Sequence, residues 1–116
     1  MTHDTRKNTM TIDNIPFRDK SPISEAIRER QKFRSNAMRG NDVSPDYLPS
    51  TGKLPDDWAI LFRAEKPTYI VISYLTPIAW WSETLGWTVP DVTYSTTTTK
   101  HQNAVRAALR GEKARS

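Results

Sequence analysis

Few side chains in this sequence are suited to acid–base or metal chemistry. The 116 residues contain two histidines, His3 and His101, and no cysteine. Cysteine-dependent catalysis is therefore excluded. Because His3 lies in an expected N-terminal tail, we expect no pair of imidazoles at the spacing that zinc sites use. We predict no metal and no cofactor, and His101 is the one candidate general base.

His101 lies just beyond a run of threonines that leads into an expected helix. Thr99 and Gln102 have the spacing of a capping box, which predicts a C-terminal helix that begins at Lys100. In its first turn the helix dipole would disfavour the imidazolium, and a neutral His101 could act as a general base. A histidine in that position more commonly makes a structural hydrogen bond. A small hydrolase or nuclease centred on His101 is therefore the alternative interpretation.

Other motifs typical of catalysis are absent or weak. Asp56 and Asp57 are adjacent, so their carboxylates should point apart and serve a helix or turn cap rather than paired acid and base work. The sequence has four glycines and none of the glycine-rich phosphate loops or nucleophile elbows. We therefore predict that the protein is not an enzyme.

The net charge of +4 hides a segregation of charge along the chain. Residues 22–39 carry five basic and two acidic side chains, residues 40–99 carry three and seven, and residues 100–116 carry five and one. If the two basic segments lie side by side, they form one positive face that attracts nucleic acid or an acidic protein; solubility is the alternative explanation. The candidate contact residues are Arg28, Lys32, Arg39, Arg106, Arg110 and Lys113.

Trp80 and Trp81 are candidate interface aromatics. They are neighbours on an expected strand, so their rings should project to opposite faces of the sheet. A single core can bury one ring, and the other is then covered by a helix, a loop or a partner. An aromatic ring beside basic side chains is a common interface anchor.

The elements that position these residues predict one α+β domain. We expect a small, strongly bent antiparallel sheet of about four or five strands from Trp58 to Thr96, with an N-terminal and a C-terminal helix on either side of it in sequence. Ser21 and Pro22 predict the start of the first helix, which should run to Gln31. The expected strands are Trp58–Arg63, Tyr69–Tyr74, Ile78–Trp81, Trp87–Val89 and Val92–Thr96.

The segments between these elements are less regular. Phe33–Gly40 fits either a continued helix or a short strand, and Thr76 with Pro77 predicts a sharp corner. The proline-rich stretch 41–57 should be a loop that Tyr47, Leu48 and Leu54 anchor to the core. We expect the domain to span residues 21–110, between flexible tails at 1–20 and 111–116. With neither an apolar leader nor a membrane-length apolar run, we expect no membrane contact and a cytoplasmic location.

Several spaced motifs carry a resemblance that spans about Phe33 to Gln102. SYLTPIAW at 73–80 and PDVTYSTTTTKHQ at 90–102, with RSNAMRG at 34–40 and TGKLP at 51–55, resemble a group of small uncharacterised proteins of actinobacteria and their bacteriophages. The resemblance implies a compact domain and assigns no catalytic residue. We therefore predict a non-enzymatic binding module of phage or mobile-element type that acts on a host protein or on nucleic acid.

Overall fold

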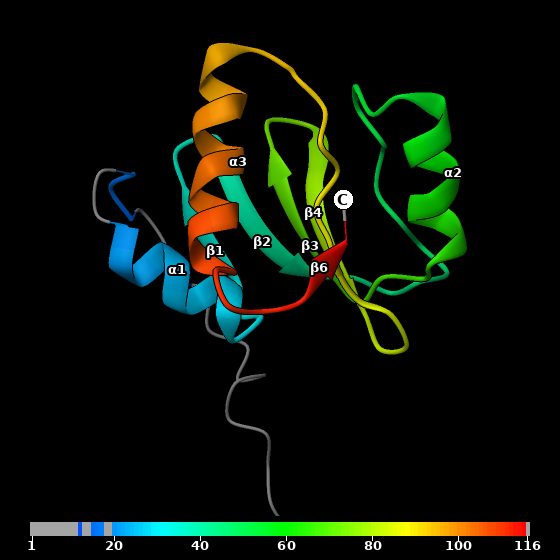
Figure 1. Ribbon diagram of the computed structural model, residues 1–116, viewed down its shortest axis with the longest axis horizontal. Coiled ribbons are helices and arrows are strands. Elements are labelled where there is room, and N and C mark those ends of the chain that lie inside the picture. The colour runs from blue at the N-terminus through cyan, green and yellow to red at the C-terminus, as the bar shows by residue number, and fades with distance from the viewer. Residues whose placement is uncertain (1–11, 13–14, 18–19, 116) are drawn as a thin grey trace, which may run out of the picture.

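A computed structural model describes residues 12, 15–17 and 20–115 of the chain. Within these residues, three helices and six strands form three layers, with the sheet between α1 and α3 on one side and α2 on the other (Figure 1). The helices are α1 (Lys20–Arg28), α2 (Asp56–Ala64) and α3 (Thr96–Ala108). The strands are β1 (Phe33–Ser35), β2 (Met38–Asp42), β3 (Tyr69–Ser73), β4 (Thr76–Ser82), β5 (Gly86–Thr88) and β6 (Ala114–Arg115).

The six strands lie in the sheet in the order in which they occur in the chain. Neighbours from β1 to β5 are antiparallel, whereas β6 is parallel to β5. The predicted α+β class is confirmed, but the sheet is mixed and has more strands than the four or five expected. The difference arises at both ends, where residues 33–42 form a hairpin and Ala114–Arg115, which we expected in a flexible tail, pair with β5.

The stretch Trp58–Arg63, which we predicted as a strand, is the centre of α2, so that prediction is wrong. A six-residue apolar run does not distinguish a strand from a helix by its pattern alone. The helix buries Ala59 and Phe62, three residues apart, and leaves Ile60 and Leu61 exposed. The two acidic residues at its start lie in the first turn, where the helix dipole favours negative charge.

α1 and α3 pack against each other and against one face of the sheet. α1 begins at Lys20 and ends at Arg28, earlier than predicted, because Arg30 adopts a left-handed backbone with a φ of 52°. The apolar stripes of the two helices bury the following residues together with the sheet: Ile23, Ala26, Ile27, Ala104, Val105 and Ala108. This cluster is the main hydrophobic core.

α3 begins at Thr96, four residues before the predicted start at Lys100. Its N-cap is Ser95, whose Oγ accepts a hydrogen bond of 3.2 Å from the amide of Thr98. The predicted capping box is therefore wrong, and the side chain of Gln102 donates instead to the carbonyl of Val92 at 2.8 Å. The last predicted strand, Val92–Thr96, is also wrong: residues 92–94 are irregular, Ser95 is the N-cap and Thr96 is the first residue of α3.

Phe33–Gly40, for which the sequence left helix and strand open, forms the β1–β2 hairpin. Asn36, with a φ of 52°, provides the left-handed residue of its turn. Gly40 lies in β2 rather than ending a helix, and the rings of Phe33 and Tyr69 lie over it. A Cβ at Gly40 would come within 2.5 Å of the Phe33 ring and closer still to the Tyr69 hydroxyl. The glycine is therefore required by close packing.

The β3–β4 hairpin turns at Tyr74 and Leu75, so the corner predicted at Thr76 and Pro77 is wrong by two residues, and both of these residues belong to β4. β4 accommodates Pro77 through a bulge: Val71 pairs with Ala79 and Ile72 pairs with Pro77. The sheet is therefore continuous through this proline.

Only part of the expected anchoring of the loop at residues 41–57 is present. Leu54 is buried and Leu48 packs against the same cluster, but Tyr47 is 84% exposed, so its predicted anchoring role is wrong.

Both segments that we expected to be tails contribute residues to the fold. Ile15 belongs to the core, although most of the expected tail 1–20 lies outside the described residues. At the other end, the Val89 amide donates to the Arg115 carbonyl at 2.6 Å.

Candidate functional site

A pocket of about 520 Å³ lies beside the N-terminus of α3, at the upper end of that helix in Figure 1. Three segments line it: Gly52–Lys53 from the long loop, Ser73–Thr76 from the β3–β4 turn, and residues between 94 and 98. Its volume is in the range of small-molecule and side-chain binding sites. The wall is mainly apolar and its polar groups are mostly hydroxyls.

A chain of hydroxyl groups connects this pocket to His101. The Oγ of Ser95 lies 3.2 Å from Oγ1 of Thr98, which lies 3.1 Å from Oγ of Ser73. The Oγ of Ser73 in turn lies 2.7 Å from Nδ1 of His101. The Tyr94 hydroxyl, at the pocket wall, is buried and has no hydrogen-bond partner in the described part of the chain. These contacts link β3 to α3 directly beneath the pocket.

His101 lies in the second turn of α3, not in the first turn as predicted, and it is 3% exposed. The ring of Phe17 packs edge-on against it at 5.1 Å between centroids. Burial lowers the pKa of His101, so desolvation rather than the helix dipole favours its neutral form. No carboxylate among the described residues is hydrogen-bonded to this imidazole. The described residues therefore supply an imidazole–hydroxyl pair, and none of them provides the acidic third member of a catalytic triad.

Replacing His101 by Asn should lower the free energy of unfolding at pH 7 by about 1–2 kcal/mol, because the buried Ser73 hydroxyl loses a well-placed partner. The folded-state pKa of His101 is below its ordinary value, so between that lowered pKa and about pH 6.5 the unfolded chain binds a proton that the folded chain does not. Acid should therefore destabilise the wild type more than His101→Asn. Urea unfolding of both proteins between pH 5 and 7 measures this; equal pH slopes would contradict the assignment.

The six predicted basic contact residues do not form one surface. Arg106 is exposed on α3, and Arg110 and Lys113 are exposed in the segment that follows the helix. Arg28, at the end of α1, joins them because its Nη1 donates to the Ala108 carbonyl at 3.4 Å. This contact places a cation at the C-terminal end of α3, which the helix dipole favours.

Arg39 lies apart from this group, on the opposite side of the sheet. It alternates along β2 with Met38, which belongs to the core beneath α1 and α3. Lys32 is half-buried before β1. Lys100, which was not among the predicted contact residues, is exposed on α3. We define the α3 basic surface as Arg28, Lys100, Arg106, Arg110 and Lys113.

Trp80 and Trp81 lie on opposite faces of β4, as expected from strand geometry. Trp80 is fully buried beneath α2, and its ring centroid lies 4.9 Å from that of Phe62. Trp81 is half-buried on the other face, and the guanidinium of Arg30 lies 4.1 Å from the centre of its ring. Of the two candidate interface aromatics, Trp81 is the one accessible to a partner.

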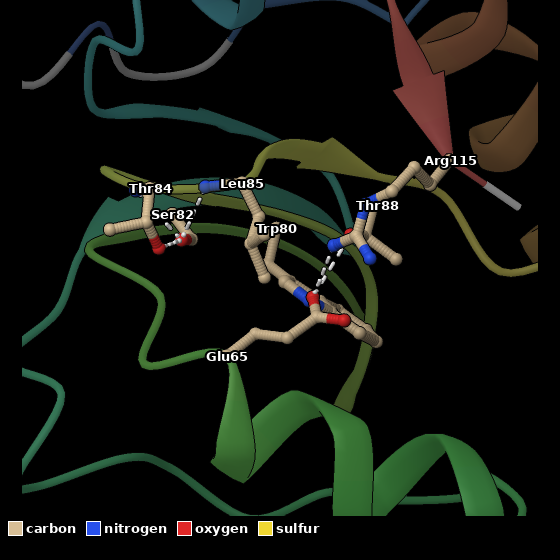
Figure 2. Close-up of polar contacts among 7 residues, drawn as sticks. All are labelled: Glu65, Trp80, Ser82, Thr84, Leu85, Thr88 and Arg115. Atoms are coloured by element: carbon tan, nitrogen blue, oxygen red, sulfur yellow. Dashed lines mark hydrogen bonds and ion pairs between the residues drawn. The ribbon is translucent and has the colours of Figure 1, made fainter.

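A buried polar cluster, which sequence reasoning missed, centres on Glu65 at the C-terminal end of α2. Figure 2 shows the carboxylate between the ring of Trp80 and the guanidinium of Arg115. Its Oε1 accepts from Trp80 Nε1 at 2.8 Å and from Thr88 Oγ1 at 3.0 Å, and lies 2.8 Å from an Arg115 nitrogen. No sequence motif indicates this site, because its members come from four separate elements or their ends.

The family of unknown function DUF8033 matches residues 20–115, and the chain belongs to that family. The match runs from the start of α1 to the end of β6 and assigns no activity. No curated protein and no solved structure matches the chain. Within the described residues, no group of three or more acidic, histidine or cysteine side chains is placed to hold a metal ion. The helices in this part of the chain are too short or too polar to cross a membrane.

Proposed function

We propose that this protein is a non-enzymatic binding module that recognises an anionic surface on another macromolecule. The observation that carries the proposal is the α3 basic surface. Lys100 and Arg106 are exposed on a helix whose other side is buried in the core, and the other three cations, Arg28, Arg110 and Lys113, are exposed near its C-terminal end. A helix held in this way presents its charges from a backbone that is already ordered, so binding adds only the cost of ordering the side chains. The resemblance to proteins of actinobacteria and their phages suggests a phage or mobile-element accessory protein that acts in the host cytoplasm.

An acidic patch on a host protein fits this surface better than nucleic acid does. The exposed carboxylate of Glu25 lies on the neighbouring α1, that of Glu29 directly follows this helix, and that of Glu112 precedes Lys113 in the chain. Arg106 also lies 3.7 Å from the exposed Asp91. These interspersed negative charges weaken the positive potential by which a protein surface attracts a phosphate backbone. They suit a protein partner whose own surface carries a complementary pattern of charges. Nucleic acid is the competing target.

A DNA titration separates these two targets. Three or four phosphate contacts would make binding of a labelled 20-base-pair duplex fall by roughly 40- to 150-fold between 50 and 200 mM salt. We expect weak binding at 50 mM salt that is lost in Arg106→Ala/Arg110→Ala. Arg39→Ala is the matched control, because Arg39 lies on the other face of the sheet and should have no effect. Tight binding that persists at 200 mM salt would instead favour nucleic acid as the target.

The contact of 2.7 Å between Ser73 and His101, at the wall of the pocket, favours a small hydrolase as the second candidate. In that case His101 would accept the proton of Ser73 as the serine oxygen attacks the carbonyl carbon of a bound ester, and would return it to the alcohol that leaves when the ester C–O bond breaks. Water would then hydrolyse the acyl-enzyme. Hydrolysis of 4-nitrophenyl acetate that disappears in both Ser73→Ala and His101→Asn, with the fold retained, would support this candidate. Turnover that both variants retain would exclude it.

A further inference from the structure

The edge of β5 is occupied by the last two described residues of the chain. Trp87 pairs with Ala114 and Thr88 with Arg115, in parallel, and the Val89 amide donates to the Arg115 carbonyl. β5 has β4 as its other neighbour. If β6 were removed, β5 would therefore present a row of unpaired backbone groups, which is the template on which extended peptides add a strand.

The buried carboxylate of Glu65 lies beside this edge of β5, and its negative charge is stabilised by a cation. Glu65 is 7% exposed and lies at the C-cap of α2, where the partial negative charge of the helix end adds to that of the carboxylate. Its other two donors, the Trp80 indole and the Thr88 hydroxyl, are neutral. Arg115 supplies the positive charge, and the same guanidinium nitrogen also donates to Thr88 Oγ1. The site thus combines strand pairing with recognition of an arginine (Figure 2).

The segment that fills the site is held by few contacts. Residues 110–115 are all exposed, and the side chain of Arg115 remains 47% exposed despite its ion pair. β6 has only two residues, and Ala114 adds almost no apolar surface. Gly111, with a φ of 93°, lies in the turn between α3 and this strand. A strand of this length can leave the edge without disturbing either hydrophobic cluster.

We propose that β5 and Glu65 form a docking site for an extended, arginine-bearing segment of a partner protein, and that Ala114–Arg115 occupy this site in cis as a competing segment. The proposal rests on the binding function above and specifies a second contact for it. Charge complementarity selects the arginine, and the β5 edge selects an extended backbone. The tethered segment is present at an effective concentration on the order of millimolar, so a partner must out-compete it.

The test uses the full chain with Arg115→Ala, which leaves the carboxylate without its cation. A synthetic peptide with the sequence of residues 111–116, GEKARS, is titrated in against GEKAAS, and the NMR signal of the Trp80 indole N–H reports on Glu65. We expect GEKARS to return that signal toward its wild-type position and to bind at least about tenfold more tightly than GEKAAS. Wild type should bind GEKARS about tenfold more weakly than Arg115→Ala, because its own segment competes.

Adding Glu65→Gln to Arg115→Ala should remove the preference for GEKARS. If Arg115→Ala does not fold, Arg115→Gln takes its place, because its amide still donates a hydrogen bond but carries no charge. Equal binding of the two peptides, or no movement of the Trp80 signal in a folded variant, would overturn the proposal. A wild-type dimer that GEKARS dissociates would also overturn it, since the occupant would then be a second copy. Arg106→Ala/Arg110→Ala should bind GEKARS as tightly as the wild type does. The proposal for β5 and Glu65 can therefore be wrong while the proposed role of the α3 basic surface is right, and the reverse.

Discussion

Replacing Trp80 by Ala should lower the free energy of unfolding by about 3–5 kcal/mol, the range for truncating a large buried aromatic. The ring is fully buried and packs edge-on against Phe62 and against Trp58, with centroids 4.9 and 6.3 Å away. The substitution also leaves the buried Glu65 carboxylate without its indole donor. For a domain of ordinary stability such a loss is a large fraction of the total. Urea denaturation followed by far-UV circular dichroism measures it.

Trp81→Ala is the matched comparison, one residue away on the other face of the same strand. We expect it to cost about 1 kcal/mol, because the ring is only half-buried and a partly solvated contact with Arg30 contributes little. Trp80→Phe should cost less than Trp80→Ala, since the ring packing is largely kept and only the N–H donor is lost. Equal, large losses for Trp80→Ala and Trp81→Ala would show that both rings are core and would remove Trp81 as an interface candidate.

Replacing Glu65 by Ala should cost about 3 kcal/mol, because the Trp80 indole and the Thr88 hydroxyl lose their shared acceptor in a buried place. The guanidinium of Arg115 also loses its counter-ion, but being half-exposed it regains water. Glu65→Gln should cost less, since its amide oxygen can still accept from both neutral donors. Thermal and urea unfolding measure these differences.

Glu83→Ala is the control for this pair, because Glu83 is an exposed acidic residue in the β4–β5 turn. Its loss should change stability by less than about 0.5 kcal/mol. Glu65→Ala with a stability equal to that of Glu83→Ala would show that the buried cluster contributes nothing net. That outcome is known for some buried ion pairs, in which desolvation offsets the Coulomb attraction.

The strongest local patterns were sufficient to predict several elements and the fold class. Alternating and β-branched residues predicted β3, the centre of β4 and β5, and the spacing of apolar residues predicted α1 and most of α3. The opposite orientation of Trp80 and Trp81 also follows from strand geometry alone, because successive side chains on a strand point to opposite faces. These features depend on residues that are close in sequence.

The wrong predictions occur where two local structures are compatible with the same residues. Trp58–Arg63 is apolar enough for either a strand or a helix, and the packing of Phe62 and Ala59 beside Trp80 decides for α2. Thr99 and Gln102 match a capping box, but Ser95 caps the helix one turn earlier. In both cases the sequence offers two satisfactory solutions, and contacts with distant residues select one.

The functional features depend most on the tertiary structure. Ser73 and His101 are 28 residues apart, and Glu65 and Arg115 are 50 apart, so no local spacing indicates either pair. The sequence alone determined the number and sign of the charges near each end of the chain. The fold decided which of them share a surface, because pairing in β2 places Arg39 on the opposite side of the sheet from the basic residues of α3. Side chains distant in sequence come together only after the helices and strands have packed.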